Sequence, residues 1–208
     1  LLCHAALRLP DLLDWSPDIV HCHDWHAALA AVLLRSAYRT SPRLAAARTV
    51  LTLHNIGYQG VFPGTLAGEL GLPPAAAAAA PDLNLLRDGI AAADALSTVS
   101  PTHAAEILTA GYGKGLDALL RSRRDRLTGI LNGVDDSAWN PATDPALPAR
   151  YDVRSLAGKQ ACRAALAARA GFGTAADQPL LGMVTRLAEQ KGIDLTLAVG
   201  NVALALIG

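Results

Sequence analysis

The sequence predicts an α/β fold built on a parallel sheet that helices cover on both faces. Short runs rich in β-branched residues alternate with longer stretches whose apolar residues recur at helical spacing. Polar residues follow each predicted strand, as in folds that bind ligands at the strand ends. Of the 208 residues, 51% are hydrophobic and 17% are charged, which suits a globular protein of one domain, or of one and a half smaller ones.

The first predicted strand, Ile19–His23, leads into a helix over Trp25–Arg35, where Ala and Leu recur at helical spacing. A second strand is predicted over Thr49–Leu53, because this run is rich in β-branched residues. It ends at His54-Asn55 and continues into a long loop with several glycines.

A low-complexity stretch separates this loop from the next helix. Residues 73–81 hold six alanines flanked by prolines, which favours a surface excursion. A helix is then predicted over Leu83–Ala93, and a third strand over Ala95–Val99. Ser100 and Pro101 follow as the N-cap and first residue of another helix.

Two more strands are predicted, over Leu127–Leu131 and Leu180–Val184. Between them a helix over Leu156–Ala170 stops at Gly171, where a C-terminal glycine belongs. The apolar tail Leu195–Ile207 is too short and too interrupted to span a bilayer, so we interpret it as a buried helix. The sequence opens inside a predicted helix and stops in an apolar run, so we expect a fragment that is incomplete at both ends.

The Pro- and Asp-rich stretch Asp135–Pro148 marks the expected boundary between two lobes, 1–134 and 135–208. Lys plus Arg (18) equals Asp plus Glu (18), so no net charge recruits nucleic acid or an anionic membrane. The run Arg121–Arg126 has no interleaved aromatic residues and is interpreted as a solvated helix face. Three scattered cysteines favour a reduced, cytoplasmic protein.

The polar residues at the predicted strand ends indicate one shared cleft, or two that face each other. In open parallel sheets, ligands bind in the crevice outside the carboxyl ends of the strands. Asn, Asp and Ser also stop strands for local reasons, so any single end is as consistent with a turn as with a site. The set as a whole favours a site; its members are Asp24, His54-Asn55, Ser100, Asn132 and Arg186.

His21 and His23 lie on one face of the first predicted strand, so a metal site has to be weighed. Few further ligands accompany them, and no second histidine-acid group follows, so we predict no metal and interpret both as core or cleft-lining residues. No cofactor is predicted either.

Two motifs carry side chains that suit ligand binding. His54 and Asn55 offer hydrogen-bond donors to sugar hydroxyls, although a turn-stabilising pair is an equal alternative. Arg186 and Lys191 place two cations five residues apart after a predicted strand, which suits a leaving diphosphate. A solvated helix start that pairs with Glu189 is the alternative.

Several motifs, taken together and in order, resemble those of bacterial glycogen synthases and plant starch synthases, glycosyltransferase family 5. The similarity runs from about Pro17 to Asp194. Its motifs are His21-Cys22-His23-Asp24-Trp25-His26-Ala27, Leu53-His54-Asn55-Ile56-Gly57-Tyr58-Gln59-Gly60, Ser97-Thr98-Val99-Ser100-Pro101-Thr102, Tyr112-Gly113-Lys114-Gly115-Leu116-Asp117, Gly129-Ile130-Leu131-Asn132-Gly133-Val134-Asp135, Trp139-Asn140-Pro141 and Thr185-Arg186-Leu187 with Gln190-Lys191-Gly192.

This resemblance implies Rossmann-like parallel sheets in a GT-B arrangement of two lobes, and a retaining glucosyltransferase that needs no metal. It would transfer glucose from a nucleotide-glucose, with ADP-glucose expected, to the non-reducing end of an α-1,4-glucan. The implied catalytic residues are His54, near the donor glucose, and Arg186 and Lys191, on the diphosphate. The implied substrate-binding residues are Asp24, Trp25, Asn55, Tyr58 and Asn132.

The family's amino-terminal Lys-x-Gly-Gly loop and its later Glu-rich motif are absent, so we expect this chain alone to be inactive. A non-catalytic glucan-binding or vestigial product of a truncated synthase gene is the main alternative. A sucrose-type synthase is disfavoured by the Tyr-Gly-x-Gly-Leu-Asp and Trp-Asn-Pro motifs, and a metal-dependent hydrolase by the poor ligand set.

Overall fold

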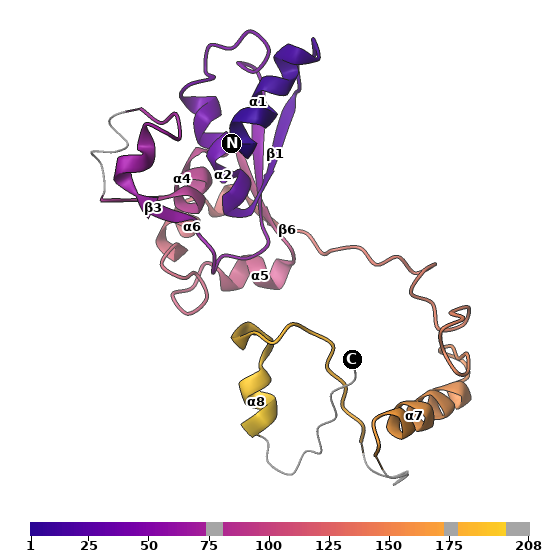
Figure 1. Ribbon diagram of the computed structural model, residues 1–208. Helices are drawn as coiled ribbons and strands as arrows, with labels where there is room; N and C mark the ends of the chain where they lie inside the picture. The colour runs from indigo at the N-terminus through magenta and orange to yellow at the C-terminus, as the bar shows by residue number, and fades with distance from the viewer. Residues whose placement is uncertain (74–80, 173–178, 199–208) are drawn as a thin grey trace. The chain divides into compact units, whose positions relative to one another are not determined.

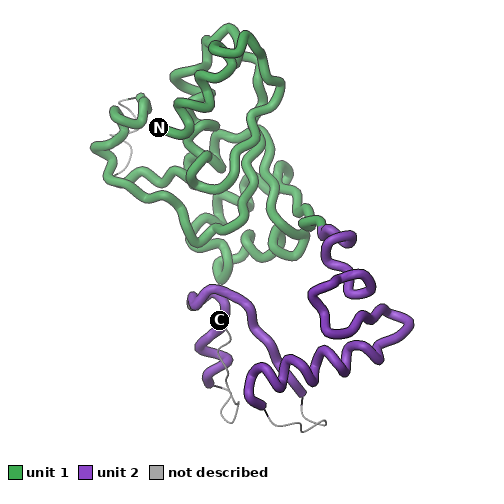
Figure 2. Tube along the Cα trace, turned by 45° about the vertical axis from the view of Figure 1, so that its right-hand side comes forward, with its two compact units in different colours: residues 1–133 green, residues 134–208 purple. Residues whose placement is uncertain are grey.

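The computed structural model describes residues 1–73, 81–172 and 179–198. The chain divides into two compact units, residues 1–133 and 134–208, which Figure 2 distinguishes by colour. The predicted surface excursion over 73–81 lies almost entirely outside the described residues. The units are described one at a time below.

A parallel sheet of four strands forms the centre of the first unit (Figure 1). The strand order is β1-β2-β5-β6, with every neighbouring pair parallel. The bounds are Ile19–His23 for β1, Arg48–Leu53 for β2, Ala95–Thr98 for β5 and Leu127–Gly129 for β6. The first four predicted strands are therefore confirmed, and their carboxyl ends lie at one edge of the sheet.

Helices α2 (Asp24–Arg35) and α4 (Leu85–Ala92) pack closely against each other beside the sheet. A Cβ atom on Gly89 would lie only 2.6 Å from Cβ of Ala28, so glycine is what lets the two helices approach this closely. Their buried leucines join those of β2 and β5 in one apolar core. This burial is the main force that holds the unit together. The other helices in the described part of the unit are α1 (Leu2–Leu12), α5 (Pro101–Glu106) and α6 (Asp117–Ser122), with the 3-10 turns η1 (Gly64–Ala67) and η2 (Arg124–Arg126).

One face of β1 is open to solvent, whereas helices were predicted to cover both faces of the sheet. In the described residues, Ile19, His21 and His23 alternate along the strand and all three are exposed, whereas Cys22 on the opposite face is buried. The core side of β1 is thus packed, while its histidine side is open.

The predicted helix over Leu83–Ala93 begins two residues later than expected. Residues Asp82–Asn84 form strand β4, which pairs antiparallel with β3 (Val61–Pro63). The side chain of Asn84 then caps α4 by accepting a hydrogen bond from the Arg87 backbone. The predicted Ser100 cap of α5 is confirmed, because its side chain accepts from the backbone of His103.

The arginine-rich run at Arg121–Arg126 is not simply a solvated face. Arg123 donates to the carbonyl of Ala91 at 2.6 Å and also to that of Ala93, at the C-terminus of α4. Arg126 donates to the carbonyl of Asp94 at 3.2 Å. The last carbonyls of a helix lack partners within the helix, and a cation near this end also interacts favourably with the negative end of the helix dipole. The run therefore caps α4, which no pattern within the run itself indicates.

The second unit is built around helix α7 (Ala157–Arg169), followed by the turn η3 (Glu189–Lys191) and helix α8 (Ile193–Ala198). Gly171 has φ +70, in agreement with its predicted place after the helix end. The predicted strand Leu180–Val184 is wrong. This run has no regular secondary structure, residues 181–184 are exposed, and no strand occurs in the described part of this unit with which it could pair.

The predicted buried helix over Leu195–Ile207 is described only as far as Ala198. Leu195 and Leu197 lie on α8 and are exposed, so the described part is helical but not buried. Within the described residues, no helix is both long enough and apolar enough to cross a membrane.

Candidate active site

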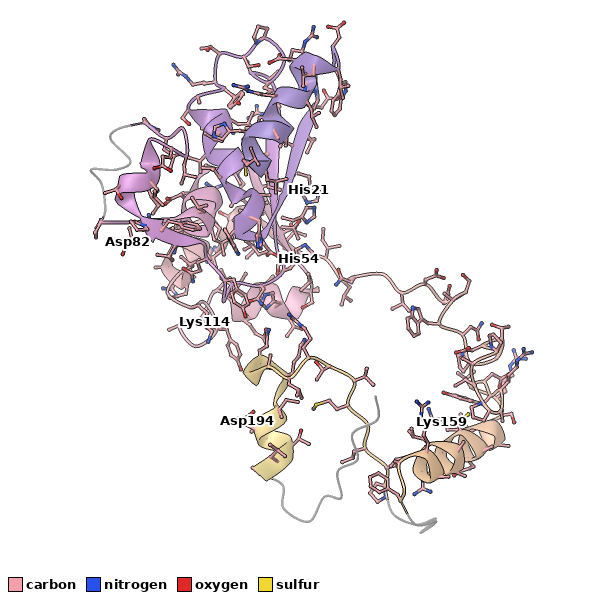
Figure 3. All side chains as sticks on the ribbon, in the orientation of Figure 1. His21, His54, Asp82, Lys114, Lys159 and Asp194 are labelled. Atoms are coloured by element: carbon pink, nitrogen blue, oxygen red, sulfur yellow. The ribbon has the colours of Figure 1, made fainter. Side chains whose placement is uncertain are left out.

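The carboxyl edge of the sheet brings together the polar residues that follow β1, β2 and β5. Asp24 begins α2 directly after β1, His54 and Asn55 follow β2, and Ser100 comes two residues after β5. Parallel pairing places these ends side by side, and Figure 3 shows the labelled His21 and His54 close to each other. The shared edge predicted from the strand ends is present in this unit.

Asp24 ties the end of β1 to the loop that follows β2. Its Oδ1 atom accepts hydrogen bonds from the backbone nitrogens of His54, at 2.7 Å, and Asn55, at 3.2 Å. The backbone of Asp24 is left-handed, with φ +53, which is uncommon outside glycine but is tolerated by Asp. The carboxylate thus fixes where the His54-Asn55 backbone lies.

A cavity of about 310 Å³ opens beside Asp24. It is lined by Asp24, Trp25, His26, Asn55 and Tyr58. Four of the five are residues that the sequence resemblance assigns to substrate binding. His26 belongs to the same motif as Asp24 and Trp25, but no role in the site is predicted for it from the sequence.

The aromatic wall of this cavity is held by packing. The Trp25 ring stacks on His26 with centroids 3.9 Å apart and meets the ring of Phe62 at 5.9 Å. Gly60 passes beneath Trp25 with φ +63, and a Cβ there would lie 2.4 Å from Cε3 of the indole. Glycine at position 60 is therefore required both by the backbone conformation and by the close approach of the ring.

Gln59 anchors the loop from the other side, a role that the sequence did not indicate. Its side-chain nitrogen donates to the carbonyl of Lys114 at 2.9 Å, and its oxygen accepts from Asn84 at 2.6 Å. The carbonyls of Gln59 and Gly60 accept from the backbones of Leu86 and Leu85 at the start of α4. The loop after β2 is therefore held by α4 and by the turn at Lys114 as well as by Asp24.

Three histidines stand together on the open face of the sheet. Nδ1 of His23 lies 3.0 Å from Nε2 of His54, and the rings of His21 and His23 contact each other in a tilted arrangement with centroids 4.3 Å apart. Nε2 of His21 lies 2.7 Å from the hydroxyl of Thr52. Burial, followed by the charges of His23 and His54, lowers the pKa of His21, which favours its neutral form.

The described residues contain no group of three or more His, Cys, Asp or Glu side chains arranged to hold a metal ion. The three cysteines form no disulfide. Burial, with a contribution from Cys3, raises the pKa of Cys22 to about 11, so this thiol is a poor nucleophile at neutral pH.

Four predicted site residues are not among those that line this cavity. His54 precedes the lining residue Asn55 and contacts the His23 ring. Asn132 is exposed in the segment after β6, at the end of the first unit. Arg186 and Lys191 belong to the second unit. Arg186 is exposed and its carbonyl accepts from the Ala188 nitrogen, while Lys191 ends the η3 turn just before α8.

A sequence profile of the family described as the starch synthase catalytic domain matches residues 1–122, more than half of the chain. This chain belongs to the starch synthase catalytic-domain family. The family resemblance read from the motifs is therefore confirmed.

Curated relatives of the family agree with this membership. The glycogen synthase of Anaeromyxobacter dehalogenans strain 2CP-C is 52% identical over 202 residues, which cover 95% of this chain and 42% of the relative. That of Opitutus terrae is 46% identical over 201 residues, 94% of this chain and 42% of the relative. The chain thus spans about two fifths of the length of these synthases.

A solved structure extends the agreement to the fold. The catalytic domain of starch synthase IV from Arabidopsis thaliana, bound to ADP and acarbose, matches with a TM-score of 0.81 and 36% identity. The match covers 95% of this chain and 42% of that chain. The predicted α/β fold with a parallel sheet, of the GT-B type found in starch synthases, is confirmed.

Proposed function

We propose that the protein carrying this sequence is a glycogen (starch) synthase. It transfers glucose from ADP-glucose to the non-reducing end of an α-1,4-glucan, with retention of configuration. The observation that carries the proposal is the cavity lined by Asp24, Trp25, His26, Asn55 and Tyr58, in a chain that belongs to the starch synthase family.

The lining of the cavity supports a sugar ligand. Sugar rings present apolar faces and a rim of hydroxyls, which suit aromatic walls combined with a few polar groups. Trp25 supplies an aromatic wall, and the Asn55 amide supplies both donors and acceptors. Tyr58 is 62% exposed at the mouth, so an entering ligand can reach its ring.

His54 and the cations of the second unit complete the proposed chemistry. His54 acts close to the donor glucose, where Asp24 holds its backbone at the edge of the cavity. Arg186 and Lys191 neutralise the diphosphate as it leaves, because a guanidinium fork and an ammonium both bind phosphate oxygens strongly. Asn132 contacts the sugar. That a solved relative carries ADP and acarbose supports a nucleotide-sugar donor and a glucan acceptor.

Two further points belong to this proposal. We place the boundary between the two lobes near the division at residues 133 and 134, with the second lobe binding the nucleotide-sugar. The three cysteines without disulfides support a cytoplasmic protein.

The test is glucosyl transfer by the full gene product. Purified protein is incubated with glycogen and either ADP-glucose or UDP-glucose, and the anomeric configuration of the new linkage is read by NMR. The proposal expects α-linked product, with ADP-glucose as the better donor. Glycogen binding without transfer from either donor would instead support the non-catalytic, glucan-binding alternative.

A further inference from the structure

His23 lies against the proposed catalytic His54, although the proposed chemistry gives it no task. Nδ1 of His23 and Nε2 of His54 are 3.0 Å apart, which is hydrogen-bonding distance, and the ring centroids are 5.3 Å apart. His23 is exposed and does not line the cavity beside Asp24. His23 therefore contacts the proposed catalytic residue His54, but it does not itself line the cavity where we place the substrate.

His23, the last residue of β1, and Asp24, the first of α2, hold His54 in different ways. Asp24 fixes the backbone of His54 through its carboxylate, at 2.7 Å. His23 contacts the ring of the same residue. The parallel register pairs His23 with Thr52, two residues before His54, so the strand itself places the two imidazoles side by side. Backbone and ring of His54 are thus set from one strand end.

The ring of His23 is also held by a contact with His21. The His21 ring packs against it in a tilted arrangement with centroids 4.3 Å apart, and Nε2 of His21 lies 2.7 Å from the hydroxyl of Thr52. That hydroxyl lies 2.7 Å from the hydroxyl of Ser97 in the buried part of the sheet. A chain of polar contacts therefore runs from the core strands to His21, and the contact between the two rings passes this restraint to His23.

The contact between His23 and His54 also constrains their protons. Only one hydrogen fits between two imidazole nitrogens, so one ring donates, the other accepts, and their tautomers are complementary. If both rings carried a proton on the facing nitrogens, two N–H groups would oppose each other. Replacing His23 therefore changes both the orientation and the proton placement of His54.

We propose that His23 is a positioning residue that sets the ring orientation and tautomer of His54. The inference rests on the proposed function, because it assigns His23 to the same reaction. His23 does not line the cavity where we place the substrate, whereas the alignment of His54 matters at the reacting centre. Loss of His23 therefore lowers kcat much more than it raises KM.

The direct test is an NMR measurement that does not depend on turnover. The imidazole nitrogens of His54 are observed in ¹⁵N-histidine-labelled full gene product, and in its His23→Phe, His23→Asn and His4→Asn variants. His23→Phe keeps the ring and removes the hydrogen bond, so the His54 nitrogen shifts change. His4, which contacts the carbonyl of Leu70, is the remote control and leaves them unchanged. Identical His54 shifts in parent and His23→Phe overturn the proposal.

Kinetics then separate positioning from a merely structural role. We expect His23→Phe to lower kcat by about 10-fold to 10²-fold, with KM for ADP-glucose within about twofold. His23→Asn places an amide near the lost Nδ1 and restores most of kcat. In a double-mutant cycle, adding His23→Phe to His54→Ala costs nothing further, because the partner through which His23 acts is gone.

The two proposals fail in different ways. A parent protein that transfers no glucose contradicts the proposed function, while the NMR shifts still decide the role of His23. The positioning role alone is contradicted if His23→Phe transfers glucose as fast as the parent. It is also contradicted if the activity losses of His23→Phe and His54→Ala multiply in the double-mutant cycle.

Discussion

Oδ1 of Asp24 accepts hydrogen bonds from the backbone nitrogens of His54 and Asn55 and so joins the ends of two neighbouring strands. The strand-end pattern predicts that Asp24 and His54 share an edge of the sheet. The structure adds that the carboxylate is engaged with the backbone of the proposed catalytic loop, so Asp24 orders the site as well as lining its cavity.

Replacing Asp24 tests this ordering role. Asp24→Ala removes the acceptor and places alanine at φ +53, so we expect a loss of about 1–3 kcal/mol in unfolding free energy and a steep fall in kcat. Asp24→Asn keeps an oxygen acceptor and tolerates the left-handed backbone, so its stability stays close to that of the parent. Chemical denaturation of both variants measures the difference.

Asp14 is the matched control for Asp24. It is also left-handed, with φ +52, but it lies before β1 and away from the cavity. Asp14→Ala therefore carries a similar backbone penalty and leaves kcat unchanged. Equal kcat losses in the alanine variants of Asp14 and Asp24 would contradict the ordering role.

Gly60→Ala displaces the Trp25 ring. The new Cβ would lie 2.4 Å from the indole, at a backbone with φ +63, so we expect about 2–4 kcal/mol of destabilisation and an altered Trp25 environment. Gly115→Ala controls for the backbone alone, because its φ is +84 and no atom lies within 4 Å of the new Cβ. Fluorescence in a background that retains Trp25 as the single tryptophan reports the displacement. A spectrum unchanged in Gly60→Ala but shifted in Gly115→Ala would refute the packing account.

Asp94 makes folding stability depend on pH in the acid range. Burial alone would raise its pKa, but hydrogen bonds from Thr49, the charge of Arg35 and a hydrogen bond from Arg48 outweigh burial and lower it. A carboxyl whose pKa is lower in the folded state stabilises the fold above its unfolded pKa, about 3.9, and that contribution disappears as the pH falls through the folded pKa.

We therefore expect Asp94→Asn to lower the unfolding free energy at pH 7 and to flatten its decline below about pH 4. Urea denaturation at several pH values measures both effects. A variant whose acid decline is as steep as that of the parent would show that Asp94 does not contribute to it.

Arg123 caps the C-terminus of α4 through the carbonyls of Ala91 and Ala93. We expect Arg123→Ala to cost about 1–3 kcal/mol of unfolding free energy, because it leaves these helix-end carbonyls without their charged donor. Arg124→Ala is the neighbouring control, since the Arg124 side chain is 74% exposed and should cost no more than about 0.5 kcal/mol. Equal thermal stability of the two variants would rule out the cap.

Local patterns predicted the first unit well, because alternation and helical spacing reflect which side of an element is buried. β1, β2, β5 and α2 lie where these periods place them, and Ser100 caps α5 as its position before Pro101 predicts. The ordered motifs predicted the family for a related reason, since they follow the strand ends that form the site.

What the sequence could not predict depends on contacts between distant residues. The His23–His54 contact, the caps provided by Arg123 and the links made by Gln59 all join segments that are 30 or more residues apart or lie on different loops. The strand expected at Leu180–Val184 fails for the same reason. A strand exists through its pairing, which an apolar run alone does not supply.

The central claim is that His54 and Arg186 act in glucosyl transfer. The most direct measurement is kcat for transfer from ADP-glucose to glycogen by the full gene product, beside its His54→Ala and Arg186→Ala variants. The account predicts an active parent and a fall of about 10²-fold to 10³-fold in each variant, the usual effect of losing a positioned electrostatic group. A folded parent that transfers glucose from no nucleotide donor, or variants as active as the parent, would contradict it.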